Sequence, residues 1–152
     1  MDKQIAALAQ RYLGVERLRS VPGVGPIIAT AYVLTLDSPE RVASSRAVGA
    51  FLGLRPRQAQ SGERDPQRRI SKTGNEFLRR LLVQAAQYTL GPFGPDSQLR
   101  RRGLQLAASG GQRGKKRAVV AVARKLAVLL HCLWRSGQMY RPFPDAQPSA
   151  AA

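Results

Sequence analysis

The segment that most restricts the fold is a long apolar stretch near the C-terminal end of the chain. Between residues 115 and 136, apolar side chains fall on nearly every face of a helix, among them Val122, Leu126 and Leu130. A helix that is hydrophobic almost all round belongs at the centre of a bundle. Its longest apolar run, from Leu126 to Trp134, is well below the roughly 18 residues that a membrane span needs. We therefore expect an all-α fold, a compact helical bundle built around this segment, with no membrane partner.

Local signals place the other helices. Apolar residues that include Tyr12 and Leu13 recur at helical spacing and predict an amphipathic helix over residues 3–19, interrupted near Gly14. Further helices are expected over residues 26–36, 45–52, 75–90 and 96–108. Gly53 should be a left-handed C-cap, and Arg79 and Arg80 should point outward. The Gly and Pro residues of 91–95 end one helix, and residues 109–111 form a flexible turn.

The length of 152 residues fits one domain. We expect residues 1–17 to be an N-terminal helix, of the kind that can end a longer linker or coiled coil. Residues 18–140 form the main domain, and residues 141–152 are expected to be a disordered tail. Residues 55–74 are rich in Arg, Gln, Ser and Gly, so we expect an exposed basic loop or small hairpin between helices.

Charge indicates the kind of partner. The chain has 25 Lys and Arg against nine Asp and Glu, a net charge of +16, and 20 of the basic residues are Arg. Arginine's planar fork matches phosphate oxygens, and an uncompensated basic surface needs a polyanion to relieve its repulsion. The candidate DNA- or RNA-binding side chains are Arg55, Arg57, Arg64, Arg68, Arg69, Lys72, Arg79, Arg80, Arg113, Lys115, Lys116 and Arg117.

The turn Val21-Pro22-Gly23-Val24-Gly25-Pro26 has the pattern of a DNA-binding helix-hairpin-helix. Gly23 and Gly25 would let the backbone approach a phosphate, and Pro26 suits the first position of the next helix. The free N–H groups at that helix start favour an anion. Since these contacts are directed at phosphates and no groove-reading helix stands out, we expect sequence-tolerant DNA binding.

Several other classes of site are excluded. The single Cys132 and single His131 provide no cluster of soft metal ligands, and His131 is interpreted as a packed residue. Residues 110–116 lack the Walker spacing, so nucleotide hydrolysis is rejected. The scattered acids offer no metal site in this chain. With no secretion signal apparent, a bacterial cytoplasm, in association with the nucleoid, is the expected location.

Ordered motifs across residues 18–140 resemble the C-terminal domain of the insertion sequence 110 transposase family. They are Pro22-Gly23-Val24-Gly25-Pro26, Phe51-Leu52-Gly53-Leu54-Arg55-Pro56, Gln60-Ser61-Gly62, Ile70-Ser71-Lys72-Thr73-Gly74-Asn75, Leu78-Arg79-Arg80-Leu81-Leu82, Ala121-x-Ala123-Arg124-Lys125-Leu126 and Tyr140. The resemblance implies a recombinase that moves an insertion sequence by DNA strand exchange.

The same resemblance implies that Ser61 is the catalytic residue. It also implies a resolvase-like, RNase H-type domain, in cis or in trans, whose acids bind Mg²⁺. A structured noncoding RNA would be a further partner, and the full enzyme would be a homo-oligomer. That acidic domain is absent from this sequence, so we expect the chain to be inactive alone. No cofactor is expected in this chain itself.

Two other classes fit part of the sequence. A stand-alone, non-catalytic DNA- or RNA-binding protein would need only the hairpin and the arginines. A basic ribosome-associated protein would explain the charge but not the glycine hairpin. In favour of the recombinase, a serine hydroxyl can attack a phosphodiester and conserve its bond energy as a phosphoserine link.

Overall fold

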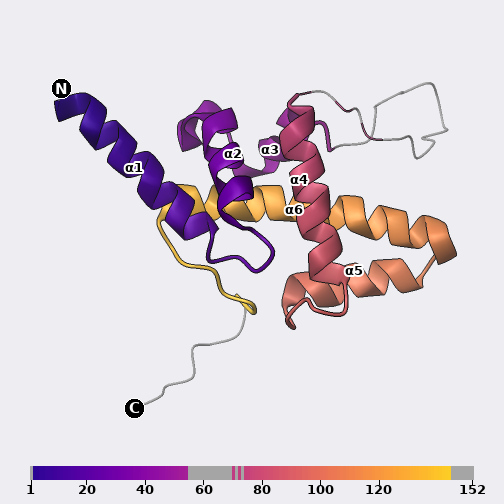
Figure 1. Ribbon diagram of the computed structural model, residues 1–152. Helices are drawn as coiled ribbons and strands as arrows, with labels where there is room; N and C mark the ends of the chain where they lie inside the picture. The colour runs from indigo at the N-terminus through magenta and orange to yellow at the C-terminus, as the bar shows by residue number, and fades with distance from the viewer. Residues whose placement is uncertain (1, 55–69, 71, 73, 145–152) are drawn as a thin grey trace, which may run out of the picture.

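A computed structural model describes residues 2–54, 70, 72 and 74–144 of the chain (Figure 1). The long helices are α1 (Asp2–Leu18), α2 (Pro26–Leu36), α4 (Glu76–Leu90), α5 (Gln98–Ala108) and α6 (Gly111–Ser136). Three short elements, η1 (Pro39–Arg41), η2 (Ser45–Ala47) and α3 (Val48–Phe51), lie between α2 and α4. Every regular element in the described part is helical, which confirms the all-α prediction. None of these helices is long and apolar enough to cross a membrane.

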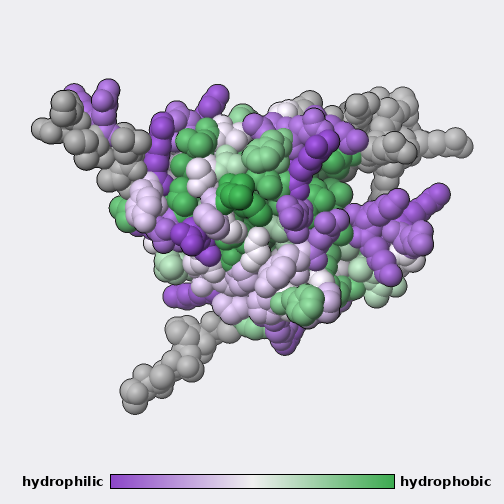
Figure 2. Space-filling model, viewed as in Figure 1, coloured by the Kyte–Doolittle hydropathy of each residue, from purple (hydrophilic) through white to green (hydrophobic). Residues whose placement is uncertain are grey.

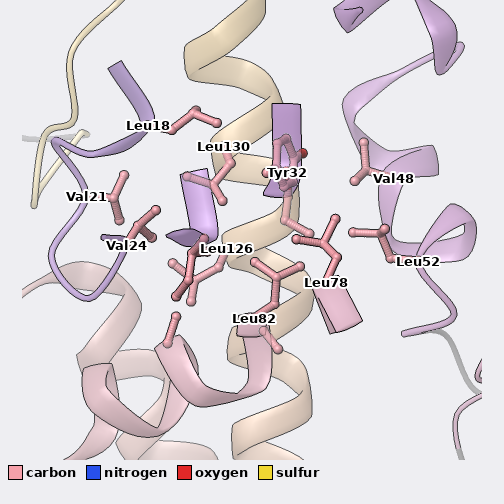
Figure 3. Close-up of a cluster of buried hydrophobic side chains, with 14 of the residues drawn as sticks. Leu18, Val21, Val24, Tyr32, Val48, Leu52, Leu78, Leu82, Leu126 and Leu130 are labelled. Carbon is pink, nitrogen blue, oxygen red and sulfur yellow. The ribbon is translucent and has the colours of Figure 1, made fainter. Parts of the chain in front are cut away.

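Helix α6 is the centre of the bundle, as its apolar sequence predicts. It packs against α1, α3, α4 and α5, and α4 crosses it while α5 runs back along it (Figure 1). Leu126 and Leu130 from α6 meet Leu78 and Leu82 from α4 in one continuous core (Figure 3). The helix begins at Gly111 rather than at residue 115, so the expected flexible turn is shorter than predicted.

Helix α1 is continuous through Gly14, so the predicted interruption there is wrong. A Cβ atom at Gly14 would lie 2.6 Å from Nε1 of Trp134 on α6. The glycine therefore serves the close approach of two helices and does not break the first one. Tyr12 and Leu13, before this contact, are 66% and 54% exposed, and the N-terminal half of α1 projects from the bundle (Figure 1).

The remaining helix ends follow local chemistry. Helix α2 has the predicted bounds, with Pro26 in its first turn. The helix expected over residues 45–52 is split into η2 and α3, and Gly53 has the expected positive φ of 72°. Asn75 and Ser97 cap α4 and α5 by accepting from the N–H groups of Leu78 and Arg100.

The segment after α6 returns to the bundle. The N–H of Gln98 donates to the carbonyl oxygen of Pro142 at 2.9 Å. The guanidinium of Arg101 lies 4.9 Å from the centroid of the Phe143 ring. Residues 141–144 are therefore docked on α5, whereas we expected a disordered tail from residue 141. Residues 145–152 lie outside the described part.

Candidate nucleic-acid interface

A tight turn joins α1 to α2. The N–H of Val24 donates to the carbonyl of Val21 at 3.0 Å, and Gly23 between them has a φ of +88°. Proline at the second position and a left-handed glycine at the third are the signature of a type II β-turn. Val21 and Val24 are 2% and 3% exposed, so the flanking valines anchor the turn in the core.

The two glycines of this turn have different roles. A Cβ at Gly23 would lie 2.7 Å from Cδ1 of Tyr88, so the turn packs directly against α4 there. Gly25, in contrast, has no heavy atom other than those of its two chain neighbours within 4 Å of its ideal Cβ position. We had predicted that both glycines serve phosphate approach. In the structure Gly25 has the open space for that contact. Gly23 is instead required because a larger residue would collide with the Tyr88 ring.

Gly25 is the N-cap residue of α2, and no side-chain hydrogen bond caps this helix start. The first N–H groups of a helix lack intrahelical acceptors and carry the positive end of its dipole. Pro26 has no N–H, so the available donors are those of Ile27 and Ile28. The α2 start can therefore receive an anion.

The rest of α2 exposes mainly apolar side chains, with Thr30 as an exposed polar residue among them. Its eleven residues include no charged side chain, and Ile27 and Leu34 are 67% and 62% exposed. With Phe77 of α4 they border a shallow apolar groove of about 420 Å³, within the green surface over α2 and α4 in Figure 2. Contact between free backbone N–H groups of α2 and a phosphate is thus restricted to its N-terminal end.

A second basic surface lies at the start of α6. The predicted binding residues Arg113, Lys115, Lys116 and Arg117 are all exposed there. They lie at the free end of the α5–α6 pair, where hydrophilic side chains gather on the right of Figure 2. No acidic residue occurs in α5 or α6. Cations at a helix N-terminus repel one another and also oppose the helix dipole. A bound anion there would offset both of these unfavourable interactions.

The predicted outward orientation of Arg79 is wrong. Arg79 is 8% exposed, and its Nη1 donates to the carbonyl of Leu52 at 3.4 Å, which ties α4 to the end of α3. Its spacing from Leu82 and Ala86 places it on the inward face of the helix, a signal that its positive charge obscured. Arg80 is exposed as predicted and forms a 2.9 Å ion pair with Glu76.

Lys72 lies beside the start of α4. Its N–H donates to the carbonyl of Gly53 at 3.1 Å, and its φ of +56° is an uncommon backbone conformation for lysine. Its side chain is exposed and, with Arg79 and Arg80, borders a groove of about 330 Å³ along α4. The structure thus brings Lys72, Arg79 and Arg80 together at one groove.

The remaining predicted site residues lie outside the described part of the chain. They are Arg55, Arg57, Ser61, Arg64, Arg68 and Arg69, together with the predicted basic loop that carries them. The sequence does not predict the contact of Tyr88 with the turn at Gly23. Aromatic spacing on α4 alone does not reveal which helix a tyrosine will meet.

His131 has the structural role that we predicted. It is fully buried, its Nε2 donates to the carbonyl of Pro39 at 2.7 Å, and its Nδ1 lies 2.8 Å from Oγ of Ser45. It links α6 to η1 and η2.

Among the described residues no group of three His, Cys, Asp or Glu could hold a metal ion. Glu16, Asp37, Glu76 and Asp96 each pair with an arginine.

Comparison with known proteins identifies relatives. Residues 15–100 match the family model described as "Transposase IS116/IS110/IS902 family". The chain is 33% identical over 140 residues, 92% of its length, to a transposase for insertion sequence element IS1111A from Coxiella burnetii. It is 32% identical over 142 residues to a "Probable family 20 transposase" from Pseudomonas aeruginosa, with 93% of the chain aligned.

A third relative matches a shorter segment. The transposase for insertion sequence element IS1328 from Yersinia enterocolitica is 43% identical over 72 residues, 47% of this chain and 22% of that protein. The matches to the Coxiella and Pseudomonas proteins cover 38% and 41% of their lengths. The chain therefore spans about two fifths of those relatives.

Proposed function

Because the chain belongs to the IS116/IS110/IS902 transposase family, we propose that it is the DNA-binding part of a recombinase that moves an insertion sequence by strand exchange. The observation that carries this proposal is the open helix start at Gly25, in a chain with a net charge of +16. The turn and its two helices act as a helix-hairpin-helix that holds a DNA phosphate.

The phosphate contact uses the backbone and does not depend on base sequence. A phosphate oxygen accepts hydrogen bonds from the N–H groups at the start of α2, in the space beside Gly25. The dipole of α2 adds attraction at that end. The cations at the start of α6 add a second, independent contact, since nothing in α5 or α6 neutralises them.

The substitution Gly25→Asp tests this contact with little risk to the fold. Aspartate is a better N-cap residue than glycine, and the φ of −84° at Gly25 suits it, so the helix should be stabilised by a few tenths of a kcal/mol. The same carboxylate would occupy and repel the phosphate. We expect DNA affinity to fall at least tenfold, measured by fluorescence anisotropy, while the melting temperature stays equal or rises.

Ser44→Asp is the matched control. It adds the same charge at another N-cap position, where the Ser44 side chain already accepts from the N–H of Ala47. Its effect on DNA affinity should be small. Equal losses in the two variants would show that total charge matters and that the α2 start does not contact a phosphate.

We further propose that Ser61 is the nucleophile of the complete enzyme. Its hydroxyl oxygen would attack phosphorus, the proton would pass to a base, and the leaving oxygen would depart with the cleaved strand. Arg55, Arg57, Arg64, Arg68, Arg69 and Lys72 would hold the phosphate and stabilise the charge on its oxygens. This assignment comes from the family resemblance of the Gln60-Ser61-Gly62 motif.

The activating groups would come from elsewhere. The described acids pair with arginines or stand apart, so they do not fit a magnesium site, and we assign no metal step to them. A resolvase-like domain in cis or in trans would provide Mg²⁺ ligands. A structured noncoding RNA and further copies of the enzyme would complete the assembly.

The serine assignment is tested in the reconstituted enzyme, with the resolvase-like domain and guide RNA supplied. Ser61→Ala should abolish a covalent protein–DNA adduct on denaturing gels and leave DNA affinity almost unchanged. Ser71→Ala should retain the adduct, because Ser71 is assigned no role in catalysis. Peptide mapping that finds DNA on Ser71, or an adduct that survives Ser61→Ala, would exclude Ser61. The isolated chain should not cleave DNA even with Mg²⁺.

If no adduct forms on either serine while DNA affinity persists, the chain has the alternative, non-catalytic function. The chain would then act as a stand-alone binder, which needs only the α2 start and the α6 cations.

A further inference from the structure

Helix α4 exposes a polar stripe that the phosphate-binding model does not use. Arg80, Gln84 and Gln87 are spaced by four and then three residues, so they share one face of the helix, and all three are exposed. The opposite face is buried in the bundle through Leu78, Leu82, Ala85, Ala86 and Thr89. The stripe therefore faces solvent along most of the helix.

The chemistry of this stripe differs from that of the basic surfaces. Arg80 is paired with Glu76 at 2.9 Å, and the two glutamines are neutral, so the stripe has almost no net charge. A surface that only grips phosphates would present unpaired cations. Base edges instead present hydrogen-bond donors and acceptors, which match a guanidinium fork and amide groups.

We propose that α4 enters the major groove of duplex DNA and that Arg80, Gln84 and Gln87 read base edges there. The proposal rests on the DNA-binding function above and adds sequence selectivity, which neither the α2 start nor the α6 cations provide. Arginine is suited to guanine O6 and N7, and glutamine to adenine N6 and N7.

The dimensions fit a short recognition site. At a rise of about 1.5 Å per residue, Arg80 and Gln87 are roughly 10 Å apart along the helix axis, which corresponds to about three base pairs. The major groove of B-DNA, about 12 Å wide, admits an α-helix. The deep, narrow major groove of A-form RNA does not admit side chains in this way, so the stripe favours duplex DNA.

Neighbouring elements place phosphate contacts beside this stripe. The turn that precedes α2 packs against the C-terminal half of α4, since a Cβ at Gly23 would lie 2.7 Å from the Tyr88 ring. At the other end of the helix, the exposed Lys72 borders the same groove as Arg80, Gln84 and Gln87. A duplex held at either end would therefore lie next to the stripe.

The helix is also held rigidly. Asn75 caps its start by accepting from the N–H of Leu78 at 2.9 Å, and the buried Arg79 donates to the carbonyl of Leu52. Helix α4 packs against α2, α5 and α6. Side chains on a fixed helix can read bases with little loss of backbone entropy on binding.

The experiment is selection of binding sites from random duplexes with the full 152-residue chain, followed by affinity measurements on selected and scrambled duplexes. The wild type should prefer a site of about three base pairs that contains guanine and adenine. Gln84→Ala and Gln87→Ala should each lose discrimination at one position by roughly 5- to 150-fold. Arg80→Lys keeps the charge but lacks the fork, so it should lose guanine preference with an unchanged salt dependence.

Gln105→Ala and Arg102→Lys, at exposed positions of α5, are the matched controls and should leave the preference intact. Since alanine favours helix at least as well as glutamine, and lysine about as well as arginine, circular dichroism should show no loss of helicity in any variant.

Other outcomes overturn the proposal. A wild type that binds every duplex equally, with strong salt dependence, would refute base reading and leave the phosphate-binding function standing. If the stripe variants lose the same affinity for every DNA sequence, and their affinity depends less steeply on salt concentration, these residues are phosphate contacts. Tighter binding to structured RNA than to any duplex would assign the stripe to RNA. Failure to bind any nucleic acid would reject both proposals.

Discussion

At the scale of single residues, Tyr32 shows how α2 is fastened to the bundle. Its side chain is fully buried, and its hydroxyl donates to the carbonyl of Ala127 on α6 at 2.6 Å. Its ring meets Trp134 edge to face, with centroids 6.3 Å apart. Burial raises the pKa of the Tyr32 phenol well above its ordinary value, and the nearby Cys132 thiol adds to this. The same helix carries the proposed phosphate contact at its start.

Tyr32→Phe should reduce the free energy of unfolding by about 0.5–1.5 kcal/mol, because the ring remains and one hydrogen bond is lost. The raised pKa also predicts a pH effect. Above about pH 10 the unfolded chain releases this phenolic proton and the folded chain retains it, so stability falls as pH rises. Urea unfolding of both proteins between pH 7 and 11 should show a shallower alkaline decline in Tyr32→Phe. Identical alkaline slopes would contradict this assignment.

At the scale of helices, the starts fall into two groups. Helices α4 and α5 are capped by the side chains of Asn75 and Ser97. Helices α2 and α6 begin after Gly25 and Gly110, and neither has a side-chain cap. In α6 the first turns also carry cations, which disfavours the isolated helix. Among these four long helices, the two without a side-chain cap are the two whose starts we propose as anion contacts.

Arg113→Glu should separate stability from binding. An acidic side chain in the first turn of α6 favours the helix dipole, so the free energy of unfolding should rise by about 0.3–1 kcal/mol at low salt. DNA affinity should fall, because a cation at the proposed contact becomes an anion. The matched control is Arg135→Glu in the last turn of the same helix, which makes the same charge change but should destabilise the protein. A stability gain in both variants would indicate general relief of charge repulsion.

At the scale of the whole molecule, net charge sets the strength and salt dependence of binding. The net charge of +16 exceeds what solubility requires. The nine acids can pair with only a minority of the 25 basic residues, as Arg11, Arg19, Arg80 and Arg101 do. Many cations therefore remain exposed for a polyanion, including the group at the start of α6. Neutralised phosphates release their counterions, and this release gives binding its salt dependence.

If roughly six to ten phosphates are contacted, DNA affinity should fall by about 10³ to 10⁵ between 50 and 200 mM salt. Anisotropy titrations on one duplex across that range measure the slope, and circular dichroism at each salt concentration checks that the fold is retained. A flat response would contradict the electrostatic model for both the α2 start and the cations of α6.

Much of the fold and part of the site could be predicted because the signals are local. Pro26 starts α2, Asn75 caps α4, the Gly-Pro segment after Leu90 ends it, and the apolar run of α6 places that helix at the centre. Each signal acts through backbone geometry or periodicity within a few residues. The exposed cations of α6 follow from the sequence in the same way.

The sequence by itself determined the helical class, most helix bounds, the strongly basic character and the family. Only the tertiary structure decided which neighbours each residue meets. Arg79 points inward and donates to Leu52, and Gly14 allows close contact with Trp134. Gly23 packs against α4 whereas Gly25 is open, and Phe143 lies beside Arg101. These contacts join residues far apart in the chain. Helix periodicity states which face a side chain occupies, whereas packing determines what lies opposite that face.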